Sequence, residues 1–332
     1  MAPPSIDRKH ALAFRQRATH LHARLRPERL LDAAFAGLQD SAPRSAVLAL
    51  HARVADVWPS AWQDPRFVQV WGPRGAVYLV PRHDVAVFTV GRLPRDPTLQ
   101  ADIHRTADKV RKAFRIRKQR EAHVSYDQTR GLILHDLRSA SIAGTVRIDW
   151  DGSNTTWWVV DPPSLGAEFA RLELARRFLR SLGPATAEEF AWWSGATLPD
   201  ARHTFRSLEK ELVEVELEGR RSWVLRTDRA ALEKAVSSPV TRLLPPGDPY
   251  LGAGDRELLV PQSRVRSELW PKSVWPGALM VDGELVGTWR RRLGRVLVRA
   301  WRKIEADTKS SIESEAQTMP VESPKKEVRW AP

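Results

Sequence analysis

The clearest hydrophobic pattern lies in the second half of the chain. Apolar residues recur at helical spacing in "GAEFARLELARRFLRSL", which predicts a helix that ends at the Gly-Pro of 183–184. Thr186 followed by Glu189 is a capping box and predicts a second, short helix. A third helix is predicted in "LPDARHTFRSLEKELV", and the alternating segment "VEVELEGRRSWVL" predicts a hairpin that turns at Glu218-Gly219. Three helices followed by a hairpin are typical of a winged helix-turn-helix.

The same order of helices and hairpin occurs twice earlier. Residues 27–56 read as helical, and "FVQVWGPRGAVYLV" then predicts a hairpin that turns at Gly72-Pro73. Residues 98–142 also read as helical, and "GTVRIDWDGSNTTWWVV" predicts a hairpin that turns at Asp151-Gly152. The hairpins begin near 67, 144 and 213. This spacing of roughly 70–75 residues predicts three tandem winged-helix modules.

A different pattern follows after about residue 240. Short apolar segments alternate with turns, including the Asp-Gly at 282–283, and predict a small β-barrel-like module. From about Ile304 the chain is rich in Ser, Glu, Lys and Pro, which predicts a disordered tail. We therefore predict an α+β fold in five segments: 1–95, a first winged helix with an N-terminal helix; 96–163, a second winged helix; 164–238, a third winged helix; 239–303, the β module; and 304–332, the tail.

Composition restricts the function classes. The 332-residue chain is 42% hydrophobic, enough to bury a core, and its net charge of +13 predicts attraction to nucleic acid or an anionic membrane. The lack of cysteine excludes thiol nucleophiles and cysteine zinc sites, and the nine histidines lack metal-ligand spacing. No phosphate-binding loop or dinucleotide glycine fingerprint occurs, so we predict no metal or cofactor. No long apolar run or signal peptide occurs either, which predicts a cytoplasmic protein without membrane contact. We also expect a monomer.

Five segments carry a resemblance to a known family. The segments are "GLQDSAPRSAVLALHARV", "VWGPRGAVYLVPRHD", "GPATAEEFAWWSG", "LLPPGDPYLG" and "VDGELVGTWRR". Over residues 12–302 the chain resembles the winged-helix DNA-binding proteins that include the AlkZ and YcaQ DNA glycosylases. The resemblance implies tandem winged helices and a C-terminal β-barrel around a C-shaped channel for duplex DNA. It also implies excision of alkylated or crosslinked bases.

The catalytic motif of that family is Gln, one residue, then Gln or Asp. Its first position matches Gln39, and its second falls on Ser41, a departure because a hydroxyl cannot offset positive charge on a sugar. Asp40 carries a carboxylate but stands one residue early. Because Pro43 and an apolar run follow, Asp40 and Ser41 read more readily as helix caps than as catalytic residues. For Gln39 the two interpretations are equal, and we expect it to line the channel.

Candidate DNA-binding residues come mainly from two basic runs without acidic residues. Residues 109–120 and 290–303 each contain seven Lys or Arg, where phosphate contact competes with the alternative of a solvated face. Further arginines lie at the predicted hairpin tips and beside the motif. Trp71 is a candidate for stacking on an extruded base, although core packing is the commoner role. The candidates are Arg44, Arg53, Trp71, Arg74, Lys109, Arg111, Lys112, Arg115, Arg220, Arg221, Arg290, Arg291 and Arg292.

Three functional hypotheses remain at this point. The first is a nucleoid-associated, winged-helix protein that binds double-stranded DNA and is related to DNA glycosylases. The second is a monofunctional DNA glycosylase acting on alkylated or crosslinked nucleobases. The third is a basic scaffold that binds an acidic protein. Salt dependence of duplex binding separates the first two from the third, and an excision assay separates the first from the second.

Overall fold

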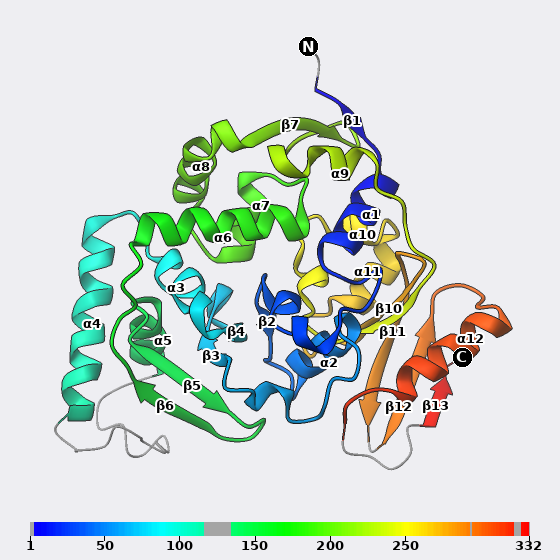
Figure 1. Ribbon diagram of the computed structural model, residues 1–332, viewed down its shortest axis with the longest axis horizontal. Coiled ribbons are helices and arrows are strands. Elements are labelled where there is room, and N and C mark those ends of the chain that lie inside the picture. The colour runs from blue at the N-terminus through cyan, green and yellow to red at the C-terminus, as the bar shows by residue number, and fades with distance from the viewer. Residues whose placement is uncertain (1–2, 116–133, 293, 322–326, 332) are drawn as a thin grey trace.

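The computed structural model describes residues 3–115, 134–292, 294–321 and 327–331, and it has a mixed α+β fold. The described strands form three sheets, in the orders β1-β7-β8, β2-β4-β3-β5-β6 and β13-β12-β11-β10-β9. Figure 1 shows α4 (Pro97–Arg115) at one end of the long axis and the last sheet at the other, with β2 (Leu38–Gln39) and α2 (Ser45–Arg53) between them. None of the described helices is both long enough and apolar enough to span a membrane.

The three predicted hairpins are confirmed. They are formed by β3 (Phe67–Trp71) with β4 (Val77–Pro81), β5 (Val146–Trp150) with β6 (Thr155–Val159), and β7 (Leu212–Leu217) with β8 (Arg220–Leu225). The third hairpin turns at Glu218 and Gly219, whose φ angles of 49° and 77° are those of the two-residue turns that suit twisted strands.

The first two hairpins do not stay separate. Gln69 of β3 pairs with Ile148 of β5, so that both hairpins lie in one sheet with β2 at its edge. Two hydrophobic core clusters include residues of this sheet. Val70, Tyr78 and Val80 belong to one cluster, and Trp71, Val146 and Ile148 belong to the other. The alternating pattern of each hairpin did not indicate this pairing, because the two strands are far apart in sequence.

The helices before the third hairpin match the sequence pattern. They are α6 (Ala167–Leu182), α7 (Ala187–Ser194) and α8 (Leu198–Ser207). The predicted capping box is present: the Glu189 N–H donates to the Thr186 hydroxyl at 3.2 Å, and the Thr186 N–H donates to the Glu189 carboxylate at 2.8 Å. Phe178 of α6 contacts Phe190 and Trp193 of α7, with ring centroids 5.4 Å apart in both pairs.

The remaining helices are short. The first of them, α1 (Arg8–Ala18), follows β1 (Ser5–Ile6), which pairs in parallel with β7, and α1 itself packs on α6 and α9. The others are α3 (Val85–Phe88), α5 (Leu134–Ile142), α9 (Arg229–Glu233), α10 (Arg256–Leu259) and α11 (Ser263–Leu269).

The C-terminal sheet is open in the described part of the chain. Its strands are β9 (Thr241–Leu244), β10 (Gly277–Val281), β11 (Glu284–Arg292), β12 (Arg295–Ala300) and β13 (Glu327–Trp330), with β9 and β13 at the edges. These strands do not close into the barrel that the sequence suggested. The predicted turn is present between β10 and β11, where Asp282 and Gly283 have φ angles of 53° and 84°.

The expectation of a disordered tail from residue 304 is wrong for its described residues. Helix α12 (Ala306–Gln317) packs on β9 and buries Ile312 and Ala316 completely. Strand β13 pairs in parallel with β12. A few apolar residues in a polar segment give no strong periodic signal, but they suffice when a preformed sheet covers them.

Candidate functional site

The motif residues lie at the end of β2. The Leu38 and Gln39 backbones pair with Leu79 and Tyr78, and the Asp40 N–H donates to the Val77 carbonyl at 2.8 Å. Because successive side chains of an extended segment point to opposite sides, Gln39 and Ser41 share one side and Asp40 takes the other. The Gln39 amide accordingly donates to the Ser41 hydroxyl at 3.2 Å. Ser41 is exposed and Gln39 is half-buried, whereas Asp40 is fully buried.

The Asp40 carboxylate holds the start of α2. One oxygen accepts the Ala46 N–H at 2.9 Å, and the other accepts the Gln69 amide at 3.1 Å. Burial raises the pKa of Asp40 to about 6, while the Ala46 N–H and the charge of Arg44 limit the rise. Asp40 thus caps α2 through the Ala46 N–H, whereas the N-cap position itself is occupied by Arg44, whose side chain makes no capping hydrogen bond. The alternative role of Asp40, a carboxylate facing the channel, is incompatible with this geometry because both oxygens already bind buried groups of the protein.

The turn that follows the motif is fastened to the second hairpin. Arg44 has a left-handed backbone, with φ of 63°, and its guanidinium lies 3.7 Å above the ring of Trp62. It donates to the Trp150 carbonyl at 3.2 Å. Gln69 accepts the Trp150 N–H at 2.6 Å and so bridges Asp40 to β5. Sequence reasoning missed Gln69, whose only signal was an amide inside an otherwise apolar strand.

The Gln39 side chain packs against a loop from the C-terminal part of the chain. A Cβ placed on Gly247 would lie only 3.0 Å from the Gln39 side-chain carbonyl carbon, and Gly247 has φ of 74°. Both observations favour glycine at this position. The Ser45 hydroxyl donates to the Gln39 carbonyl at 2.8 Å. The motif is therefore held from both sides by segments about 200 residues apart.

The family model for AlkZ-like DNA glycosylases matches residues 33–320, which include the motif and the loop that packs on it. The chain belongs to this family. The curated "Interstrand DNA cross-link repair glycosylase" of Streptomyces sahachiroi is 36% identical over 121 residues. That match covers 34% of this chain and only about a third, 32%, of the relative. A solved structure, the Streptomyces sahachiroi DNA glycosylase AlkZ, is 19% identical, with a TM-score of 0.79, and covers 98% of this chain and 100% of its own.

Two candidate residues of this AlkZ-like chain are buried in its core rather than placed on a DNA-binding surface. Arg53 is 1% exposed, and its two terminal nitrogens each lie 2.7 Å from a carboxylate oxygen of Asp248. Trp71 is 4% exposed, with its ring centroid 6.2 Å from that of Trp157. Neither can reach DNA, because a buried ion pair and a packed ring present no free face. Basic or aromatic character does not predict burial by itself.

Four candidates from the first basic run lie on α4. Lys109 donates to Asp136 at 2.8 Å, and Arg111 lies 3.3 Å from Asp161. Acidic residues from elsewhere in the chain therefore partly neutralise this basic run, which contains no acidic residue itself. Lys112 is exposed. The side chain of Arg115 and the rest of this run, 116–120, lie outside the described residues.

The other basic candidates lie on hairpins. Arg220 and Arg221 pair with Glu189 at 2.6 Å and Glu214 at 2.5 Å, respectively. Arg74 is exposed at the tip of the first hairpin. Three exposed arginines end β11, namely Arg290, Arg291 and Arg292. Figure 1 places α4 and β11–β12 toward opposite ends of the molecule, with the motif strand between them.

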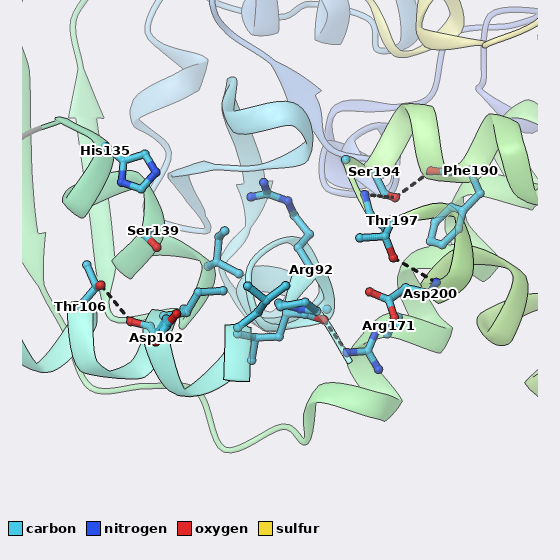
Figure 2. Close-up of a pocket in the computed structure, with 18 residues that line it drawn as sticks. Arg92, Asp102, Thr106, His135, Ser139, Arg171, Phe190, Ser194, Thr197 and Asp200 are labelled. Carbon is cyan, nitrogen blue, oxygen red and sulfur yellow. Dashed lines mark hydrogen bonds between the residues drawn. The ribbon is translucent and has the colours of Figure 1, made fainter. Parts of the chain in front are cut away.

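A cavity of about 370 Å³ lies apart from the motif (Figure 2). Its lining comes from α4 and α5 on one side and from α7 and α8 on the other, and includes Arg92, His135 and Thr197. Burial lowers the pKa of Arg92 to about 10, and one of its nitrogens donates to the Trp71 carbonyl at 2.9 Å. No residue of β2 lines this cavity, so it is not part of the motif site. Within the described ranges, no group of three His, Cys, Asp or Glu residues could hold a metal ion.

Proposed function

We propose that this protein is a monofunctional DNA glycosylase that releases alkylated or crosslinked bases from double-stranded DNA. The observation that carries the proposal is the Gln39–Ser41 pair, whose side chains are hydrogen-bonded to each other on one side of β2. Membership of the AlkZ-like family and the name of the Streptomyces relative support this function over binding alone. Ser41 then occupies the second position of the family motif.

The proposed chemistry needs little from the protein. An alkylated purine is cationic, so the bond from its nitrogen to the sugar C1′ breaks with the electron pair moving to the base, which leaves neutral. The sugar becomes an oxocarbenium ion, and a water oxygen then bonds to C1′ and releases a proton to solvent. The Gln39 carbonyl oxygen would accept a hydrogen bond from that water and orient it. The Gln39 amide dipole would stabilise the cation in part, and the Ser41 hydroxyl would hold that amide in place through the hydrogen bond between them.

The Gln39 amide dipole stabilises a cation less than a carboxylate would, and this restricts the choice of substrate. Ser41 carries no negative charge, and Asp40 is engaged with the start of α2, so no motif carboxylate faces the sugar. The enzyme would therefore depend on leaving groups that are already cationic, and would leave uncharged bases in place. The helix-then-hairpin segments are proposed to act as winged helices on the duplex, with α8 in the major groove and the β7–β8 hairpin as its wing.

The direct test is single-turnover release of 7-methylguanine from a duplex by the wild type and by Gln39→Ala, Ser41→Ala and the double variant. We expect Gln39→Ala to lower the rate by about 10² to 10³, the range found when an oriented dipole is removed from a reacting centre. Ser41→Ala should lower it less, because the Gln39 amide remains. A matched control is Ser60→Ala, a serine outside the motif.

Duplex binding without chemistry is the second candidate function. The hydroxyl at Ser41 favours it, since the family motif has Gln or Asp there. Duplex affinity together with no release from several alkylated and crosslinked substrates would establish this second function and refute the first. The third hypothesis, an acidic protein partner, predicts instead that duplex affinity is weak and nearly independent of salt.

A further inference from the structure

Two arginines share one exposed tryptophan near the tip of the first hairpin. The Arg74 guanidinium carbon lies 4.4 Å from the ring centroid of Trp192, and that of Arg256 lies 5.3 Å from the same ring. Arg256 also lies over Trp270 at 5.0 Å and Trp275 at 5.3 Å. We call these five residues the arginine–tryptophan cluster. Trp192 is 39% exposed, so one part of the cluster faces solvent.

The fold assembles this cluster from separate parts of the chain. Arg74 lies in the β3–β4 turn with φ of 56°, and Trp192 lies in the last turn of α7. Arg256 is the first residue of α10. Gly195, just beyond α7, approaches the Arg74 backbone so closely that an added Cβ would lie 3.4 Å from the Arg74 nitrogen. The hairpin tip is therefore docked on α7 and is not free in solvent.

The cluster has two positive charges without a matching carboxylate. Among the described residues, neither Arg74 nor Arg256 forms an ion pair, and the Arg256 side chain forms no hydrogen bond. The acid next to it, Glu257, pairs with Arg266 at 3.1 Å. The Nε of Arg256 is buried without a hydrogen-bond partner. Burial, and then the charge of Arg74, lower the pKa of Arg256, and the nearby Glu257 carboxylate offsets this lowering only in part.

This arrangement suits a phosphate. Guanidinium groups present planar donor pairs that match phosphate oxygens, and contact with an aromatic face does not consume a guanidinium N–H group. Arg74 also interacts with the Tyr78 hydroxyl, which leaves its other N–H groups for a ligand. By contrast, Arg220 and Arg221 on the third hairpin already have carboxylate partners. An anion that relieves the repulsion between Arg74 and Arg256 would be bound more strongly than at either arginine alone.

We propose that Arg74 and Arg256, held against Trp192, bind a backbone phosphate of duplex DNA. The proposal rests on the proposed action of this protein on DNA. Asp40 pairs with Val77, and Arg74 stands three residues farther along the hairpin. Because Pro73–Gly75 form a turn, these three residues span at most about 10 Å, the length of about three base-pair steps. A duplex whose target nucleotide lies at Gln39 would thus place phosphates within reach of the cluster.

The test measures affinity for an undamaged duplex as a function of salt concentration, for the wild type, Arg74→Met, Arg256→Met and the double variant. Each lost phosphate contact should reduce the slope of log affinity against log salt by about 0.9, which is roughly eightfold in affinity at about 0.1 M salt. Arg256→Lys should keep most of the slope. The matched control is Arg176→Met, which removes the same charge from an arginine paired with Glu211.

Several results would overturn the proposal. One is a double variant with the wild-type slope, and another is a loss no greater than that of Arg176→Met. A third is a lowered melting temperature with an unchanged slope, which would assign the cluster a purely structural role. A fourth is equal affinity of the wild type for polyglutamate and for the duplex. Because undamaged DNA is the probe, absence of excision would refute the glycosylase function and leave this site standing.

Discussion

The buried ion pair between Arg53 and Asp248 offers the sharpest separation of stability from DNA binding. We expect Arg53→Met to lower the free energy of unfolding by about 3–5 kcal/mol, the range found when one partner of a buried pair is removed. The physical reason is that the Asp248 carboxylate loses both hydrogen bonds of 2.7 Å and keeps only the Tyr250 N–H at 2.9 Å. Methionine retains much of the apolar stem, so packing changes little.

A double-mutant cycle makes the magnitude testable. Asp248→Asn alone should also destabilise, because it leaves the guanidinium buried without its counter-charge. The double variant Arg53→Met/Asp248→Asn should recover most of the loss, so that the coupling energy is about 3 kcal/mol. Urea unfolding of the four proteins supplies the values. Tyr250 retains an acceptor for its N–H in both Asp248 variants, since the asparagine amide oxygen can replace the carboxylate there.

The same variants decide what Arg53 does. At temperatures where Arg53→Met is folded, its affinity for duplex DNA and the salt dependence of that affinity should equal those of the wild type. A variant of wild-type stability with a reduced salt slope would refute the reasoning, because it would place Arg53 on DNA. Arg44→Met serves as the comparison, since Arg44 is partly exposed beside the motif.

Three further predictions concern the motif and the C-terminal segment. Because its folded pKa of about 6 exceeds the ordinary 3.8, Asp40 contributes about 3 kcal/mol of stability that is complete below pH 3.8 and lost as the pH rises through 6. In Asp40→Asn this pH-dependent part of the unfolding free energy should disappear. A variant whose stability changes with pH as the wild type's does would contradict the prediction. Gly247→Ala should cost about 1–2 kcal/mol in urea unfolding and also slow base release, since its Cβ would press on Gln39; unaltered release would argue against the contact. Ile312→Ala should cost about 2–5 kcal/mol in the same assay, whereas a negligible loss would mean that α12 does not pack.

Local signals predicted the local structure well. The capping box at Thr186 and Glu189, the turn at Asp282-Gly283 and the three hairpins are confirmed because each depends on neighbours in sequence. Adjacent residues of a helix point in different directions, and the two tryptophans of α7 do so: the side chain of Trp193 is 3% exposed and that of Trp192 is 39% exposed. The five segments that carry the family resemblance also predicted the family correctly.

The sequence by itself determined the element types, the excess of positive charge and the position of Gln39 in a family motif. Only the tertiary structure decided that Asp40 points inward, that Arg53 meets Asp248, and that Arg74 and Arg256 share Trp192. These partners are up to about 200 residues apart, and an arginine has the same identity whether a carboxylate, an indole or a phosphate faces it. Periodicity records which side of an element is apolar, but the partner of a polar group depends on which distant segment the folded chain brings against it.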